Sequence, residues 1–273
     1  MTASELDRWL GSTLTERMPV LFLGHGSPMN AIEDNLFTRG IHSKGAELPK
    51  PRAILCISAH WETYGTQFTA MVQPRTIHDF GGFPEPLYQV QYPAPGMPAL
   101  ASAGAELTLG ALDHEHWGLD HGAWSVLLHL VPNADVPVVQ MSLDRGKTPT
   151  EHVALAKSLT ALRRRGVLIV GSGNMVHNLR RVAWDRLNQV GFAYDWATEA
   201  HAVLMERVRG QRLDELAQYA RLGSAVQFAI PTPEHYLPML YALALREPDE
   251  ALEVFNDYAL AGSLTMTSLA LGA

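Results

Sequence analysis

Five histidines occupy positions from which side chains could meet to hold a metal ion or to move a proton. His25, His60 and His177 each follow an apolar run, and His121 and His235 each lie beside the expected start of a helix. Imidazole is the commonest metal ligand among side chains and the usual acid or base near neutral pH. One such histidine alone is more often structural, but the repeated placement favours a shared site.

The elements that must position these histidines are visible in the hydrophobic pattern. Four short apolar runs predict buried strands at residues 19–23, 53–58, 136–143 and 167–170. Apolar residues at steps of three and four predict helices at residues 98–112, 150–165 and 197–209, and Thr148 to Glu151 resembles a helix start. This alternation predicts a single α/β domain with a mostly parallel central sheet and helices on both faces. Ligands bind beyond the carboxyl ends of such strands, where His25, His60 and His177 fall.

His235 lies at the expected start of a further helix, with Pro233 as the first helical residue and Thr232 as the N-cap. Glu234 is a competing ligand. Neighbouring residues on a helix point about 100° apart, so we do not expect both to bind one ion. We favour His235.

His121 precedes the apolar helix expected at residues 124–130. It could act as an acid or base, or orient a substrate, with Asp120 as its partner. With equal weight, it could be a turn histidine that caps the following helix.

The segment 73–98 holds six prolines among glycines and aromatic residues. It is not expected to be helical, and its aromatic content indicates an ordered loop that covers a binding site. The denser cluster of His114 and His116 with Asp113 and Glu115 lies in a polar connection with no third ligand suggested nearby, so we interpret it as solvated.

The bulk composition narrows the class of protein. The 273 residues are 47% hydrophobic and 18% charged, as in an ordinary globular protein. The net charge is −7 and the one basic cluster, residues 163–165, reads as the polar end of a helix, so nucleic acid is not an expected partner. Cys56 reads as a buried strand residue.

Neither a signal peptide nor a membrane-spanning segment is evident in the sequence. The first 17 residues lack a basic start followed by an apolar stretch, and no later stretch has roughly 18 uninterrupted apolar residues. We therefore expect a cytoplasmic protein with no membrane partner, in which residues 1–17 form an extension and residues 18–273 form the catalytic domain.

Six short motifs appear in an order that resembles the class III extradiol ring-cleavage dioxygenases, in particular the 4,5-DOPA dioxygenase extradiol branch. They are GHGSP at 24–28, SAHWE at 58–62, TIHDFGGFP at 76–84, GLDHGAW at 118–124, GSGN at 171–174 with HNL at 177–179, and PEH at 233–235. Each motif is weak alone, but the ordered set is specific. The resemblance spans residues 18 to 270.

The resemblance implies that the chain inserts O2 into a DOPA-like catechol at a mononuclear non-haem metal site. It assigns His25, His60 and His235 as metal ligands, and His177 as catalytic base or fourth ligand. The wider superfamily has a glutamate where this branch has its third histidine, which keeps Glu234 in competition. One ion per chain is expected, with Fe2+ for activity and Zn2+ in the purified protein, because zinc binds such sites but cannot cycle electrons.

Other residues receive roles from the same resemblance. His121 would donate or orient protons during oxygen–oxygen cleavage. His78, Phe80 and Phe83 would shape the aromatic substrate pocket and restrict water. A monomer or small homo-oligomer is expected.

Two other functions use the same residues. A zinc hydrolase would attack an ester or amide with a metal-bound hydroxide and would need no oxygen. A non-catalytic binding protein similar to the Memo family would keep the histidines without needing a substrate loop, and the intact motif at 76–84 favours the enzyme.

Overall fold

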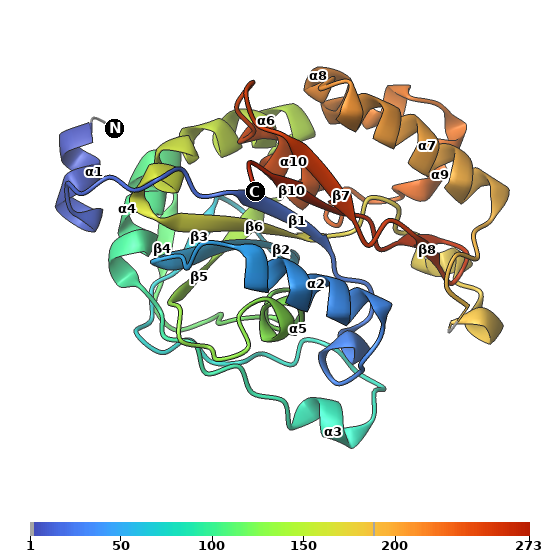
Figure 1. Ribbon diagram of the computed structural model, residues 1–273, viewed down its shortest axis with the longest axis horizontal. Coiled ribbons are helices and arrows are strands. Elements are labelled where there is room, and N and C mark those ends of the chain that lie inside the picture. The colour runs from blue at the N-terminus through green and yellow to red at the C-terminus, as the bar shows by residue number, and fades with distance from the viewer. Residues whose placement is uncertain (1–2, 188) are drawn as a thin grey trace.

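The computed structural model describes residues 3–187 and 189–273 and shows an eight-stranded sheet between two layers of helices (Figure 1). The strand order is β4-β3-β5-β2-β6-β1-β10-β7. The bounds are β1 (Val20–Gly24), β2 (Ala53–Thr63), β3 (Gln67–Thr69), β4 (Ala111–Asp113), β5 (Val138–Asp144), β6 (Val167–Gly173), β7 (Leu252–Phe255) and β10 (Ser268–Leu271). A separate two-stranded sheet joins β8 (Ala259–Leu260) to β9 (Leu264–Thr265).

Each face of the sheet has its own hydrophobic core. One core includes residues of α1 (Ala3–Leu10), α4 (Pro98–Thr108), α6 (Pro149–Ser158), α7 (Asp195–Arg209), α8 (Leu213–Ala217), α9 (Ser224–Ala229) and α10 (Leu237–Ala244). The other core lies under α2 (Leu36–Glu47), α5 (His121–Leu130) and the loop that contains α3 (Glu85–Tyr88). Five 3-10 helices complete the described chain: η1 (Pro28–Ala31), η2 (Thr160–Arg165), η3 (Leu179–Arg181), η4 (Trp184–Arg186) and η5 (Tyr219–Arg221).

The four strands predicted from apolar runs are the four central ones. β2 pairs in parallel with β5 and β6, and β6 pairs in parallel with β1. β10 is antiparallel to β1 and β7, and β3 is antiparallel to β5. The predicted α/β class with a mostly parallel sheet covered on both faces is therefore confirmed. The shorter strands towards the edges were not predicted, because strands of three or four residues carry little periodic signal.

Two predicted helices are shorter than expected. The helix expected at 98–112 ends at Thr108, where Leu109 takes a left-handed conformation with φ 55°, and residues 111–113 form β4. The helix expected at 150–165 is α6 followed by the 3-10 helix η2. Its predicted start is confirmed, because Thr148 and Glu151 form a capping box.

The arginine cluster at 163–165 forms the end of the 3-10 helix η2, as expected, but two of its side chains are buried. Arg163 is fully buried, pairs with Glu250, and donates to the carbonyl oxygens of Met18 and Leu245. A buried guanidinium is tolerated because all these acceptors replace water.

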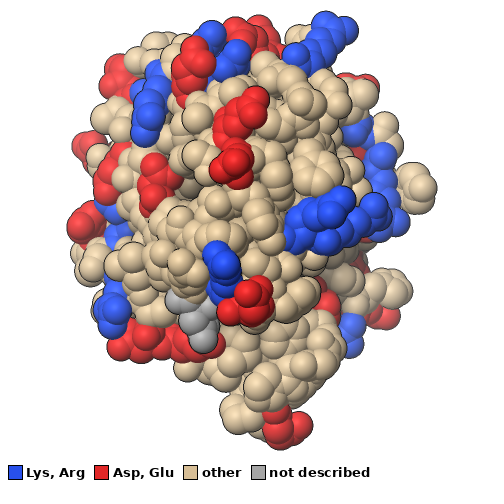
Figure 2. Space-filling view, turned by 90° about the vertical axis from the view of Figure 1, so that its right-hand side faces the viewer, with Lys and Arg blue, Asp and Glu red and all other residues tan. Residues whose placement is uncertain are grey.

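On the face drawn in Figure 2, basic and acidic side chains are interspersed around wide uncharged areas.

Two further expectations concern the core and the chain ends. Cys56 is buried in β2, as predicted. Among the described residues, no helix is long and apolar enough to span a membrane.

The N-terminal helix α1 packs against the rest of the domain, because Trp9 donates to Glu106 of α4 at 2.7 Å. The expected boundary between an extension and the catalytic domain at residue 17 stays a prediction.

Candidate metal centre

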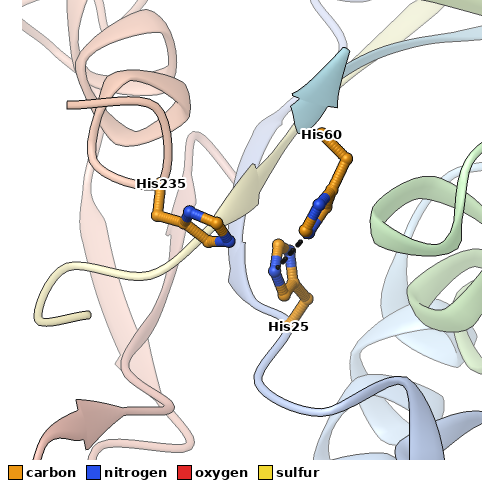
Figure 3. A group of neighbouring side chains, drawn as sticks. All are labelled: His25, His60 and His235. Atoms are coloured by element: carbon orange, nitrogen blue, oxygen red, sulfur yellow. Dashed lines mark hydrogen bonds between the residues drawn. The ribbon is translucent and has the colours of Figure 1, made fainter. Parts of the chain in front are cut away.

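Three histidine rings from distant parts of the chain point at one another near the carboxyl ends of the central parallel strands (Figure 3). His25 directly follows β1, and its backbone N–H donates to the carbonyl of Gly173 at the end of β6. His60 lies in β2 between Ile57 and Glu62, where the register with β5 is interrupted. Such irregularities re-aim side chains next to active sites.

The three rings form a nearly equilateral triangle. The His25–His60, His25–His235 and His60–His235 centroids are 4.9, 5.2 and 5.0 Å apart. The Nε2 atoms of His25 and His60 are 3.2 Å apart, and one ring nitrogen from each of the three histidines lies within 4.8 Å of the other two. Three nitrogen donors at this spacing surround a volume suited to one ion.

His235 reaches the triangle from a turn, which corrects the helix start expected at Pro233. The helix α10 begins only at Leu237, and the N–H groups of Tyr236 and Leu237 donate to the carbonyl of Pro233. The carbonyl of His235 instead accepts from Asn174 at 2.8 Å, just after β6. A Cβ on Gly173 would stand 2.1 Å from that carbonyl oxygen, so only glycine allows this approach.

An oxygen-bearing side chain faces the Nδ1 atom of each ring. The hydroxyl of Ser172 donates to the carbonyl of Gly122 at 2.5 Å and so can accept from His25 Nδ1, which is 2.9 Å away. Asp79 lies 3.8 Å from His60 Nδ1, and Glu234 lies 3.1 Å from His235 Nδ1. The contacts of His25 and His235 are within hydrogen-bond distance, whereas Asp79 acts on His60 through its charge. A proton on Nδ1 leaves the lone pair on Nε2, which is the usual arrangement around metal-bound histidines.

Burial keeps these imidazoles neutral. It lowers the pKa of His60 to about 3, and it lowers the pKa values of His25 and His235 well below 6.5, with a further contribution from neighbouring imidazoles. Neutral rings present their lone pairs near pH 7. The two Nε2 atoms, 3.2 Å apart, can share a proton in a hydrogen bond when no ion is bound. With both protons on Nδ1, the two Nε2 lone pairs face each other and fit a cation placed between them.

A histidine and a carboxylate flank the triangle on the His60 side. The ring of His121 lies 3.8 Å from that of His60, and its Nδ1 is 2.9 Å from Asp79. Burial alone would raise the pKa of Asp79, but hydrogen bonding to His121 outweighs it and leaves this pKa below its ordinary value. Asp79 is therefore a carboxylate near neutral pH and lies against the ring of His121.

The partner proposed for His121 from the sequence was wrong. Asp120 is the N-cap of α5 and accepts from the backbone N–H of Ala123 and from the hydroxyl of Ser58. Its other oxygen accepts from Gln140 and Trp117. Because these donors occupy the carboxylate, Asp79 from the preceding loop takes the place beside His121.

His177 flanks the triangle on the opposite side. Its ring stacks on that of His235 at 3.6 Å with an interplanar angle of 10°. Burial lowers its pKa to about 4, against the opposing influence of Glu234. His177, Glu234 and His235 also form a group whose ligand atoms lie within 4.8 Å of one another, so His177 lies close enough to act on anything held by His235.

Aromatic rings of the loop expected to cover a site lie beside this group. Phe80 is 5.6 Å from His121, 5.3 Å from Phe83 and 5.8 Å from His78. His78 is fixed through Nε2, which lies 2.9 Å from the carbonyl oxygen of Val90. The loop thus forms an aromatic wall next to the histidines, with one helical turn, α3, that was not predicted. His114 and His116 are exposed and lie in none of the candidate metal groups among the described residues.

Comparison with known proteins places this arrangement in a family. Residues 19–267 match the catalytic LigB subunit of aromatic ring-opening dioxygenases. The chain belongs to the LigB family. It is 46% identical to 4,5-DOPA dioxygenase extradiol of Escherichia coli K12, covering 94% of this chain and 95% of that one. It is 35% identical to the protein of the same name from Beta vulgaris, over 86% and 90% of the two chains.

A solved structure shares the fold. The crystal structure of an uncharacterised Escherichia coli K12 protein superimposes with a TM-score of 0.80 at 41% identity, covering 93% of this chain and 99% of that one. The LigB-family chain is thus a ring-opening dioxygenase, an enzyme class that acts on aromatic substrates with O2 and depends on a metal. The family resemblance expected from the six motifs is confirmed.

Sequence reasoning missed two residues of this LigB-family site. Asp79 stood inside the TIHDFGGFP motif without a role, although an acidic residue next to a histidine could have drawn attention. Ser172 stood between two glycines and gave no signal, because its importance depends on β6 lying beside β1. Of the two competing residues, His235 joins His25 and His60, whereas Glu234 faces the far nitrogen of the His235 ring.

Proposed function

We propose that this enzyme opens the ring of a DOPA-like catechol with O2, using one Fe2+ held by His25, His60 and His235. The observation that carries the proposal is the set of three neutral imidazoles whose Nδ1 atoms each face an oxygen. Three protein ligands leave positions for a substrate and O2, as in non-haem iron oxygenases. Two relatives are named for DOPA, which is a catechol, and this supports a catechol substrate.

Bound Fe2+ would supply the electron transfer that lets O2 react with a catechol, which Zn2+ cannot do. The three uncharged ligands leave the charge of the ion undiminished, so an anionic catecholate is favoured. The residues around the triangle then have to remove a hydroxyl proton, return a proton and exclude water.

His177 is proposed to take the first proton. It is neutral near pH 7, because its pKa is about 4, and its Glu234 neighbour favours the protonated ring once formed. The stack on His235 places it beside the ligand triangle rather than in it. We propose it as a base, and the fourth-ligand role remains the alternative.

His121 is proposed to supply or orient the later proton. The Asp79 carboxylate, 2.9 Å from His121 Nδ1, orients its ring. The aromatic wall of His78, Phe80 and Phe83 would contact the face of the substrate ring and keep water away.

The test begins with metal-free protein reconstituted anaerobically with Fe2+ or Zn2+. A panel of DOPA, caffeate and protocatechuate is then added with O2, and oxygen uptake and semialdehyde absorbance are recorded. We expect one O2 consumed per catechol with Fe2+ and none with Zn2+. No turnover of any catechol at full iron occupancy would refute the proposal, and hydrolysis of esters by the anaerobic zinc form would identify the zinc hydrolase instead.

Variants separate ligands from proton-transfer groups. His25→Ala should lose the ion, whereas His177→Gln and His121→Gln should keep it and lose turnover by about 100-fold or more. His42→Gln is the matched control, because His42 is exposed on α2 away from the triangle. Metal content of each variant is measured by elemental analysis. Full turnover by His177→Gln would remove the base assignment.

A further inference from the structure

A small cavity with cationic side chains lies among the helices α6, α7, α8 and α10, which cover one face of the sheet (Figure 1). Its volume is about 200 Å3, and its walls come from the ends of α6, α7 and α10 and from α8. α10 begins at Leu237, just after His235, whereas the cavity adjoins its last residues, Leu243 and Ala244. A helix of this length spans about 12 Å, so the cavity is separate from the metal centre.

The charge around this cavity is opposite in sign to that of the whole chain. The chain has a net charge of −7, yet Lys157, Arg207 and Arg246 line the cavity, and none of the described residues in its wall is acidic. Arg207 is paired outside the cavity, with Glu206 at 2.8 Å and Glu215 at 3.3 Å. Lys157 and Arg246 have no carboxylate within ion-pair distance in the part of the chain that the structure describes.

Arg246 has an unused hydrogen-bond donor. Its Nε and Nη2 groups both donate to the carbonyl oxygen of Glu250, at 3.0 and 2.8 Å. Its Nη1 atom is buried and has no acceptor among the described residues. A buried donor that belongs to a charged group and lacks an acceptor is costly, so we expect an acceptor in the cavity that Arg246 lines.

The ends of the helices give a simpler reason for two of the three cations. Lys157 lies in the last turn of α6 and Arg207 in the last turn of α7, where positive charge suits the helix dipole. Arg246 follows the end of α10, and the dipole gives its Nη1 no acceptor. An anion in the cavity would supply that acceptor and would be attracted by all three cations.

The rest of the wall is apolar. Val208, Leu216 and Leu243 line the cavity and are buried. A volume of about 200 Å3 is below the range of about 300–1,000 Å3 that is usual for drug-sized ligands, and it equals roughly six water molecules. The space therefore suits a small anion with little or no apolar body.

We propose that this cavity is a binding site for a small oxyanion, either a short-chain carboxylate or a phosphate. The oxyanion accepts a hydrogen bond from Nη1 of Arg246 and takes Lys157 and Arg207 as counter-charges. The apolar wall contacts whatever carbon chain the ligand carries. The site is independent of the proposed function, because no residue of the metal centre lines it.

The test is calorimetric titration of the zinc-loaded protein with acetate, butyrate and inorganic phosphate at constant ionic strength. Arg246→Gln keeps an amide that can donate to Glu250 but removes the charge, so the dissociation constant should rise by about tenfold or more. Lys157 is exposed at the rim, and Lys157→Gln should raise it by about two- to fivefold.

Lys50→Gln is the matched control, because it also removes one exposed lysine charge. Lys50 pairs with Asp135 and lies outside the cavity. Its variant should bind each anion as the wild type does. Lys157→Gln carries the test alone if Arg246→Gln fails to fold.

The three anions distinguish the two sources of an oxyanion. Tighter binding of butyrate than of acetate and phosphate supports a carboxylate with an apolar chain, and tightest binding of phosphate supports a phosphate ligand. No binding of any of the three to the wild type would show that water alone satisfies Arg246 and would overturn the proposal. Equal affinity in the wild type and both cavity variants would also overturn it, because the anions would then bind elsewhere, for example at the zinc ion.

Discussion

Replacing Ser172 by alanine should weaken metal binding without unfolding the protein. The Ser172 hydroxyl accepts from His25 Nδ1 at 2.9 Å, and both side chains are buried. In the metal-free protein the proton of His25 can move to Nε2. Metal binding requires that proton on Nδ1, so the loss of the acceptor is felt mainly in the metal-bound state.

The expected magnitude follows from the burial of this hydrogen bond. A buried donor left without an acceptor costs about 1–3 kcal/mol, and each 1.4 kcal/mol is tenfold in a dissociation constant. Loss of a second hydrogen-bond partner of a metal-bound histidine typically costs about 10- to 100-fold in affinity. We therefore expect the dissociation constant of the Ser172→Ala variant for Zn2+ to rise by about 10- to 100-fold.

The assay is competition for Zn2+ between the protein and a chromophoric chelator at pH 7. Ser142→Ala is the matched control, because Ser142 is fully buried in β5 and its hydroxyl accepts from the backbone of Gln67, away from the triangle. Both variants should lose similar unfolding free energy, but only Ser172→Ala should lose metal affinity. Equal Zn2+ affinity in the wild type and Ser172→Ala would refute the assignment of the His25 proton.

Three further outcomes are expected. Gly173→Ala should destabilise the protein by about 3 kcal/mol and weaken metal binding, because its Cβ would meet the carbonyl oxygen of His235; unchanged urea unfolding would contradict this. As the pH falls from 6.5 to about 4, His177 should lower the free energy of unfolding of the metal-free protein by about 1 kcal/mol per pH unit, because the unfolded chain binds a proton there and the native chain does not. Urea unfolding at pH 7 and pH 5 should show a smaller decrease for His177→Gln than for the wild type. Glu250→Gln should lower the free energy of unfolding by about 3–5 kcal/mol, because the guanidinium of Arg163 stays buried without its counter-charge. A fall in melting temperature of less than a few degrees would refute this expectation.

Local sequence patterns were sufficient for the central strands and for three of the site histidines. His25, His60 and His177 follow apolar runs, and the general rule for parallel sheets places the ends of such runs together. The capping box at Thr148 was also readable, because its two residues are close in sequence. These features depend on neighbours within a few positions.

The features that were mispredicted depend on contacts between distant segments. The turn at His235 replaces the helix start because Asn174, far away in sequence, donates to its carbonyl and Gly173 leaves room for that carbonyl. Asp79 replaces Asp120 beside His121 because Asp120 is held by Ser58 and other donors. No pattern within a single segment contains this information.

The order of the strands has a consequence for synthesis of the chain. β1 and β2 carry the first two histidines of the triangle but are not neighbours, because β6 lies between them. The ribosome makes β6 more than 100 residues after β2. Until that strand is inserted, His25 and His60 have no common framework, and His235 is made later still. A nascent chain that lacks β6 therefore cannot assemble the triangle. The metal ion can bind only after this slow pairing of distant strands is complete.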